Sequence, residues 1–291
     1  MAVGVGQRSR PEVTREVSAR QREREAYRRR RTVRRAAVGV VATVVVLGAI
    51  VVGVVSAPGW DRVRETFFSW HHARESFPAI AEAFWLNVRL FLVVEVLVLA
   101  VALVVAIVRV VPSPALLPFK ILATIYTDVF RGVPTLLVVL LVGFGFPALG
   151  LAGLPTSLFW LGAIALTLSY GAYVAEVLRA GIVSVHPTQW ASGRALGLSY
   201  GQTLRHVVLP QAVRRVAPPL INDFVSLQKD TALLSAIGLV EALRAASVYQ
   251  ADTFNFTSIG VAALFFIAVT IPLARFTDWL GIRALRRQAG A

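Results

Sequence analysis

Long apolar stretches separated by short polar segments dominate this chain. Several of them run for about 20 residues, the length that a helix needs to cross the ~30 Å hydrocarbon core of a bilayer. The pattern predicts an all-α integral membrane protein with six transmembrane helices. The predicted spans are Ala36–Val55, Phe84–Val108, Phe119–Phe144, Ser157–Arg179, Val213–Leu234 and Ser258–Leu280.

The same pattern divides the chain into regions. We expect a disordered basic cytoplasmic tail (1–35), an additional N-terminal transmembrane helix (36–55), an extracytoplasmic amphipathic loop (56–83), a main transmembrane domain (84–280) with a cytoplasmic loop (188–210), and a cytoplasmic tail (281–291). Val55-Ser56-Ala57 resembles a signal cleavage site, but the apolar run is longer than a usual signal core and Pro58 follows. An uncleaved anchor is the favoured interpretation, and cleavage remains the alternative.

The distribution of arginine along the chain predicts which segments lie on the cytoplasmic side of the membrane. The formal net charge is +14, and twelve arginines precede residue 36, whereas none lies between Pro147 and Thr156. Cytoplasmic segments carry the excess of Lys and Arg, so both termini are predicted to be cytoplasmic. Orientation accounts for the basic run, and we expect no nucleic-acid partner. With no Cys in the chain, disulfides and thiolate metal sites are excluded.

The sequence lacks the usual motifs of catalysis. The only lysines, Lys120 and Lys229, do not stand in a Gly-Lys-Ser/Thr motif, so the chain has no P-loop. Neither G-x-S-x-G nor H-E-x-x-H occurs, and His71-His72 has no carboxylate or Cys set to complete a metal site. We therefore predict no catalytic residue, no metal site and no bound cofactor.

Ionisable residues inside the predicted spans are expensive in hydrocarbon and indicate a pathway, an ion pair or a cavity. Arg131 and Glu176 lie near the cytoplasmic ends of neighbouring spans, and we expect them to pair. Asp223, Lys229 and Asp230 share one span, a density that favours a polar cavity near a permeation path. Glu95 is a weaker candidate of the same kind.

The cytoplasmic loop 188–210 contains helix start and stop signals and small residues that a simple connection between two spans does not need. Thr188 is a good N-cap for a helix from Gln189 to about Leu196, and Gly197 is placed to stop it in a left-handed conformation. The three small residues that follow Trp190 allow a partner to approach the backbone. A second basic helix, 200–208, then leads to Leu209-Pro210 and the next span.

The spacing in this loop resembles the EAA loop of ATP-binding cassette (ABC) importer permeases. Ala191-Ser192-Gly193 takes the place of the triplet, Gly197 that of the glycine, and Val207-Val208-Leu209-Pro210 that of the ending. Other stretches resemble the polar amino acid subfamily, over roughly residues 84–280; they are Phe130-Arg131-Gly132-Val133-Pro134, Tyr170-Gly171-Ala172-Tyr173-Val174-Ala175-Glu176, Leu209-Pro210-Gln211-Ala212 and Lys229-Asp230-Thr231-Ala232-Leu233.

The resemblance implies a permease subunit with a five-span core in a bacterial inner membrane, importing a polar amino acid. It implies a dimer of ABC ATPase subunits that binds ATP and Mg²⁺, a second permease subunit (identical or different) and an extracytoplasmic solute-binding protein. The coupling residues would be Ala191, Ser192, Gly193, Gly197, Leu209 and Pro210. Candidates for the translocation path or for structural pairs are Arg131, Tyr173, Glu176, Asp223, Lys229 and Asp230.

One position departs from the family pattern. Ala191 stands where the family usually has Glu, three residues after Thr188, so a Glu there would complete a capping box. The loss of that bond is expected to cost ~0.5–1 kcal/mol. Two other functions stay open at this point: a secondary transporter or channel driven by an ion gradient through Glu176, Asp223 or Lys229, and a membrane scaffold that recruits a soluble partner.

Overall fold

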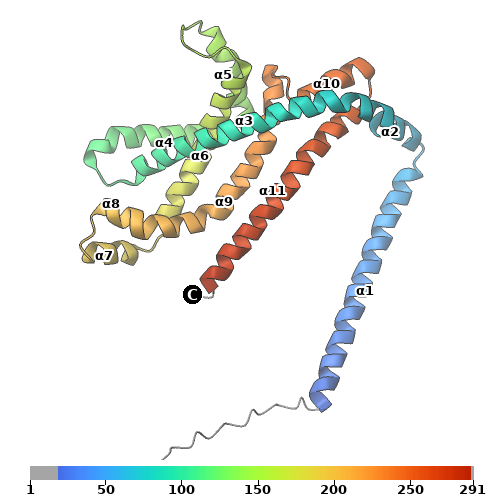
Figure 1. Cartoon of the computed structure of the whole chain (residues 1–291), viewed down its shortest axis with the longest axis horizontal. Coiled ribbons are helices and arrows are strands. Elements are labelled where there is room, and N and C mark those ends of the chain that lie inside the picture. The colour runs from blue at the N-terminus through green and yellow to red at the C-terminus, as the bar shows by residue number, and fades with distance from the viewer. Residues whose placement is uncertain (1–18, 290–291) are drawn as a thin grey trace, which may run out of the picture. The chain divides into compact units, whose positions relative to one another are not determined.

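All regular elements in the computed structural model, which describes residues 19–289, are helices (Figure 1). The α-helices are α1 (Ala19–Val55), α2 (Trp60–Phe67), α3 (Trp70–Val110), α4 (Leu117–Gly132), α5 (Thr135–Ala148), α6 (Leu158–Val183), α7 (Pro187–Ala195), α8 (Tyr200–Thr203), α9 (Leu209–Asp230), α10 (Ala242–Thr253) and α11 (Thr257–Ala289). Two 3₁₀ segments, Pro114–Leu116 and Thr231–Ile237, and a π-helical segment, Leu204–Val208, lie between them. The chain divides into two units between Val63 and Arg64.

Helix α1 is longer than the sequence predicted. It begins at Ala19, so the expectation of disorder up to residue 35 was wrong for residues 19–35, and residues 1–18 lie outside the described part. Arg, Glu, Gln and Ala are strong helix formers, and an apolar helix that has already formed can extend into them without a new nucleus. Its segment Arg31–Val55 is long and apolar enough to span a membrane.

In the second unit, α6 is the central helix and packs against α3, α4, α5 and α9. Small buried residues allow these close approaches, as is usual between membrane helices. At Gly181 a Cβ atom would overlap the side chain of Val216 on α9 and would lie 3.4 Å from the carbonyl oxygen of Ala212. At Gly162 it would overlap Leu234. The two glycines therefore set the distance between α6 and the chain segment 209–237.

The predicted span Phe119–Phe144 is not one helix. It is divided into α4 and α5, whose axes differ by 108°. The break lies at Val133, whose backbone is extended, and Pro134 lacks the N–H that would continue α4. The prediction of one continuous span from Phe119 to Phe144 was therefore wrong.

Two further boundaries differ from the prediction. Helix α3 starts at Trp70, inside the predicted amphipathic loop 56–83, and continues into the span that was predicted to begin at Phe84. Helix α9 starts at Leu209, before the predicted start of the span at Val213, and continues through Pro218-Pro219. Because proline has no backbone N–H, the carbonyl groups of Arg214 and Arg215 lose their usual helical donors. This part of α9 is exposed, so other donors can reach these two oxygens.

Within residues 19–289, four helices are long and apolar enough to cross a membrane, or up to six if each of two bent pairs forms one span. The bent pairs are α4 with α5, and the segment 200–237 with α10, which are inclined at 49°. The predicted count of six equals the upper value.

Buried polar side chains fasten α3 to the turn that precedes α10. The Asn87 amide nitrogen donates to Glu241 Oε2 at 3.1 Å and to Thr231 Oγ1 at 3.0 Å. Its oxygen accepts from the backbone N–H of Ala242 at 3.0 Å. Glu241 is fully buried and caps α10 by accepting from two backbone N–H groups of its first turn. In Figure 1, α10 lies beside the N-terminal part of α3, where these bonds hold it.

Replacing Asn87 with Leu should destabilise the chain by about 3 kcal/mol, because it leaves Glu241 and the Ala242 N–H buried without this partner. Thermal unfolding in detergent measures the effect. Asn222 is exposed and makes no hydrogen bond within the described residues, so Asn222→Leu is the matched control. Equal melting temperatures for the two variants would show that the buried network does not stabilise the fold.

Replacing Gly181 with Val should lower the melting temperature, because the added side chain overlaps Val216 and forces α6 from α9, at a cost of about 1–3 kcal/mol. Gly260→Val is the control, since nothing lies within 4 Å of a Cβ at that position. A Gly181→Val protein that melts like wild type would contradict the close approach of the two helices.

Candidate functional site: the loop between α6 and α9

The loop is organised around α7, whose N-cap is His186 and not Thr188. The His186 ring nitrogen Nδ1 accepts from the backbone N–H of Thr188 at 3.3 Å, and Pro187 takes the first helical position. The predicted N-cap was therefore wrong. Gln189 is the third helical residue and Ala191 the fifth, so a Glu at 191 would not complete a capping box with Thr188, and the predicted energetic loss at Ala191 does not apply.

Gly197 ends α7 as predicted. Its φ is +80°, in the left-handed region. The backbone N–H of Leu198 donates to the Gly193 oxygen at 3.2 Å, and that of Gly197 donates to the Arg194 oxygen at 3.0 Å. This pair of bonds is a Schellman motif, which satisfies carbonyls at the helix end and fixes the direction in which the chain leaves.

One face of α7 is anchored to the bundle. The Trp190 ring stacks on Tyr200 with centroids 4.9 Å apart and packs against a buried cluster that contains Ile182 and Val208. Burial raises the pKa of the Tyr200 hydroxyl, which keeps it protonated. Gly193 is buried against Thr203. A Cβ atom at this position would lie only 2.6 Å from the Thr203 methyl group, so a larger residue would not fit. Of the three small residues, Gly193 therefore faces the protein.

The opposite face of α7 is open. Ala191 and Ser192 are exposed, and the side chain of Leu196 is 81% exposed. An apolar side chain presented in this way beside small residues suits contact with another protein. Leu209 is half-buried against the cluster beneath Trp190, so it supports the loop from inside, whereas Pro210 is exposed in the first turn of α9.

The second helix of the loop also differs from its prediction. A capping box forms at its start, where the Ser199 N–H donates to Gln202 Oε1 at 2.8 Å and the Gln202 N–H donates to Ser199 Oγ at 3.2 Å. The helix does not restart at Pro210. It passes through the π-helical segment Leu204–Val208 directly into α9, so movement of the loop and of α9 is mechanically linked.

Glu176 forms an ion pair, but not with Arg131. Its carboxylate accepts from Arg109 Nη1 on α3 at 2.6 Å and from Arg179 Nη2, one turn along α6, at 2.6 Å. Arg131 is exposed, and the Tyr173 hydroxyl donates to its backbone oxygen at 3.1 Å. The expected Arg131–Glu176 pair was therefore wrong, because α4 ends at Gly132 and leaves the Arg131 side chain exposed. The i,i+3 spacing of Glu176 and Arg179 was the signal that the sequence analysis missed.

The other candidates in the bundle separate into two groups. Asp230 accepts from the Tyr170 hydroxyl at 2.8 Å. Asp223, Glu95 and Tyr170 line a small cavity of ≈ 20 Å³, which has room for about one water molecule. The Oδ2 atom of Asp223 is buried and makes no hydrogen bond within the described residues. Lys229 is exposed and takes no part in this group.

Gln228 lies next to Lys229 in the chain, but no sequence pattern indicated its role. It is buried in the structure, where its side chain accepts from the Thr270 hydroxyl on α11 at 2.8 Å. Elsewhere, His71 Nε2 lies 3.5 Å from Glu75 Oε2, and His72 Nδ1 makes a 2.9 Å hydrogen bond with the Tyr249 hydroxyl. Within the described part of the chain, no group of three or more His, Cys, Asp or Glu is placed to hold a metal ion.

Comparison with known proteins identifies the family. The family model "binding-protein-dependent transport system inner membrane component" matches residues 117–286, more than half of the chain. The arginine transport system permease protein ArtQ of Bacillus subtilis is 38% identical over 139 residues, which are 48% of this chain and 63% of that protein. The match thus spans less than two thirds of that relative's length.

Two further matches extend the similarity. The arginine ABC transporter permease protein ArtQ of Haemophilus influenzae is 40% identical over 167 residues, 56% of this chain and 73% of that protein. A chain in the crystal structure of an amino acid ABC transporter with histidines superposes with a TM-score of 0.63 at 28% identity, covering 71% of this chain and 94% of that one. These findings confirm the resemblance predicted from the loop. The chain belongs to the family of inner membrane components of binding-protein-dependent transport systems.

Proposed function

We propose that this chain is the permease subunit of an ATP-driven importer that moves a polar amino acid across a bacterial inner membrane. Its similar relatives include permeases named for arginine and glutamine transport, and the similar solved structure is an amino acid ABC transporter. The observation that carries the proposal is the structure of α7. This helix is capped at both ends and held to the bundle by Trp190, and its face beside Leu196 is exposed.

In this proposal the open face of α7 docks into an ABC ATPase subunit, one of a dimer that binds ATP and Mg²⁺. Ala191 and Ser192 allow close approach, and Leu196 supplies apolar contact area. Gly193, Gly197 and Leu209 act indirectly, because they hold α7 in position. A second permease subunit completes the translocation path, and an extracytoplasmic solute-binding protein delivers the amino acid.

Within the bundle, the acidic side chains on α3 and α9 are suited to the ammonium group of an amino acid. Asp223 and Glu95 line one small cavity, and the Asp223 oxygen that makes no hydrogen bond within the described residues can accept from a cation. Tyr170 lies beside both this cavity and Asp230. We place the translocation path next to these groups, whereas Glu176, already bound by two arginines, supports the helix ends.

Reconstitution tests the proposal. Proteoliposomes that contain this chain with its ATPase subunit should take up labelled arginine or glutamine only when the solute-binding protein is present and ATP is on the side of loop 188–210. An ionophore that collapses proton and sodium gradients should leave uptake unchanged. Uptake that follows an ion gradient and ignores ATP would identify a secondary transporter and refute the importer.

Replacing Gly197 with Val should reduce transport-coupled ATP hydrolysis about tenfold or more, because Val at φ +80° is strained by at least ~1–2 kcal/mol and disrupts the end of α7. The measurement is solute-stimulated ATPase activity in the reconstituted complex. Gly201→Val is the matched control, since Gly201 is exposed in α8 with no atom within 4 Å of a Cβ. Equal activity of the two variants would count against α7 as the coupling helix.

A further inference from the structure

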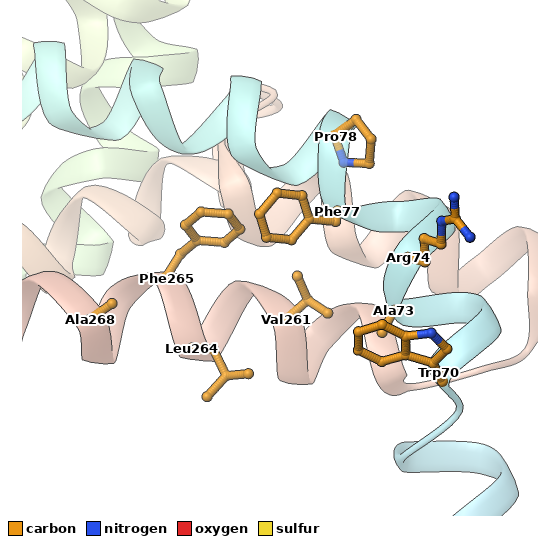
Figure 2. A pocket seen from close by; sticks show the side chains of 9 residues that line it. All are labelled: Trp70, Ala73, Arg74, Phe77, Pro78, Val261, Leu264, Phe265 and Ala268. Atoms are coloured by element: carbon orange, nitrogen blue, oxygen red, sulfur yellow. The ribbon is translucent and has the colours of Figure 1, made fainter.

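An apolar groove lies between the N-terminal part of α3 and the first half of α11, with a volume of ≈ 670 Å³ (Figure 2). The Phe77 and Phe265 rings meet across it with centroids 5.1 Å apart. Along α11 the groove runs from Val261 to Ala268, about 10 Å at the rise of an α-helix. It is lined by Trp70, Ala73, Arg74, Phe77, Pro78, Val261, Leu264, Phe265 and Ala268.

The two ends of this groove differ in chemistry. Figure 2 shows Trp70 and Arg74 together at one end and Ala268 at the other. Arg74 is exposed, and within the described residues its guanidinium makes no hydrogen bond or ion pair. Trp70 is 81% exposed. An arginine beside a tryptophan at the end of a membrane helix is typical of the boundary between hydrocarbon and headgroups.

Pro78 adds a polar acceptor at the same end. Because proline has no backbone N–H, the carbonyl oxygen of Arg74 lacks its helical hydrogen-bond partner. Arg74 thus brings to this end of the groove both a cationic side chain and a carbonyl oxygen whose usual helical donor is missing. This pair suits a ligand that carries an anion and a hydroxyl group.

The position of the groove on a predicted membrane-spanning helix, α11, limits the kind of ligand that can bind there. Its segment Thr257–Phe276 is long and apolar enough to span a membrane, so the apolar wall faces hydrocarbon and not water. The occupant at that depth must itself be apolar, while its charged part must remain near Arg74. An acyl chain joined to an anionic headgroup meets both conditions.

We propose that this groove binds one anionic phospholipid. An acyl chain packs against Phe77, Leu264 and Phe265, and the phosphate lies at the Arg74 guanidinium. The Arg74 carbonyl accepts a hydrogen bond from a headgroup hydroxyl, as in phosphatidylglycerol. With the start of α3 on the extracytoplasmic side, as the arginine distribution predicts, the lipid belongs to the outer leaflet.

Native mass spectrometry of the purified full-length chain, with phosphatidylglycerol or phosphatidylcholine of identical acyl chains, tests the site. Both lipids carry a phosphate, but in phosphatidylcholine the cationic choline cancels its charge. Wild type should therefore retain phosphatidylglycerol about fivefold more, the preference that one arginine near a membrane surface gives for an anionic lipid. Arg74→Ala should abolish this preference, and Arg74→Lys should keep it. Ala268→Phe, which fills the apolar end, should reduce retention of both lipids.

Two matched controls separate the site from general effects. Arg244→Ala removes an exposed arginine outside the groove, and Ala263→Phe adds the same ring to an exposed position of α11 outside the groove. Both should bind lipid as wild type does. Equal retention of the two lipids by wild type, an equal loss in Arg244→Ala, or no loss in Ala268→Phe would each overturn the proposal.

Discussion

The hydrogen bonds between Asn87, Thr231 and Glu241 hold a turn that the interior of a membrane protein does not otherwise tolerate. Backbone N–H and C=O groups at membrane depth need partners within the protein, which is why spans are normally unbroken helices. After Asp230 the chain leaves the α-helix for a 3₁₀ segment and a left-handed residue, Gly238. The buried side chains supply the partners that the helix no longer provides, and α10 and α11 can then return along α3.

Two acidic side chains of the bundle, Glu176 and Asp223, differ in how their charge is compensated. Glu176 is bound on both carboxylate oxygens by arginines, so its charge is compensated and it braces the ends of α3 and α6. Asp223 has no such compensation, although a buried oxygen without a partner costs roughly 1–3 kcal/mol. A structural role would favour a partnered group at that position. The missing partner is consistent with a ligand cation or water, which is the basis for placing the path beside Asp223.

Hydrophobic periodicity was sufficient to locate α3, α6, α9 and α11, but it merged α4 with α5 and did not predict α10. Glycine chemistry was sufficient to place the end of α7 at Gly197. Local sequence was not sufficient for features that depend on tertiary packing. Pro134 lies inside an apolar stretch long enough for one span, yet α4 ends before it, and α4 and α5 form two helices that each pack on α6. His186 is a rare N-cap, so Thr188 was the better guess by propensity. The i,i+3 spacing indicated Arg179 as a partner of Glu176, whereas Arg109 comes from α3, and no pattern in one sequence reveals that contact.

The position of α7 connects the loop to the acidic groups in the bundle. It is anchored between the end of α6 and the helix that continues into α9, through Trp190 on Tyr200 and Gly193 on Thr203. Below it, Gly181 brings α6 against Val216 of α9, and Arg215 of α9 donates to Ser184 at the end of α6. Close-packed helices transmit displacement because they have little free volume to absorb it. A force applied to α7 therefore reaches α6 and α9 together, and these are the helices that carry Tyr170 and Asp230.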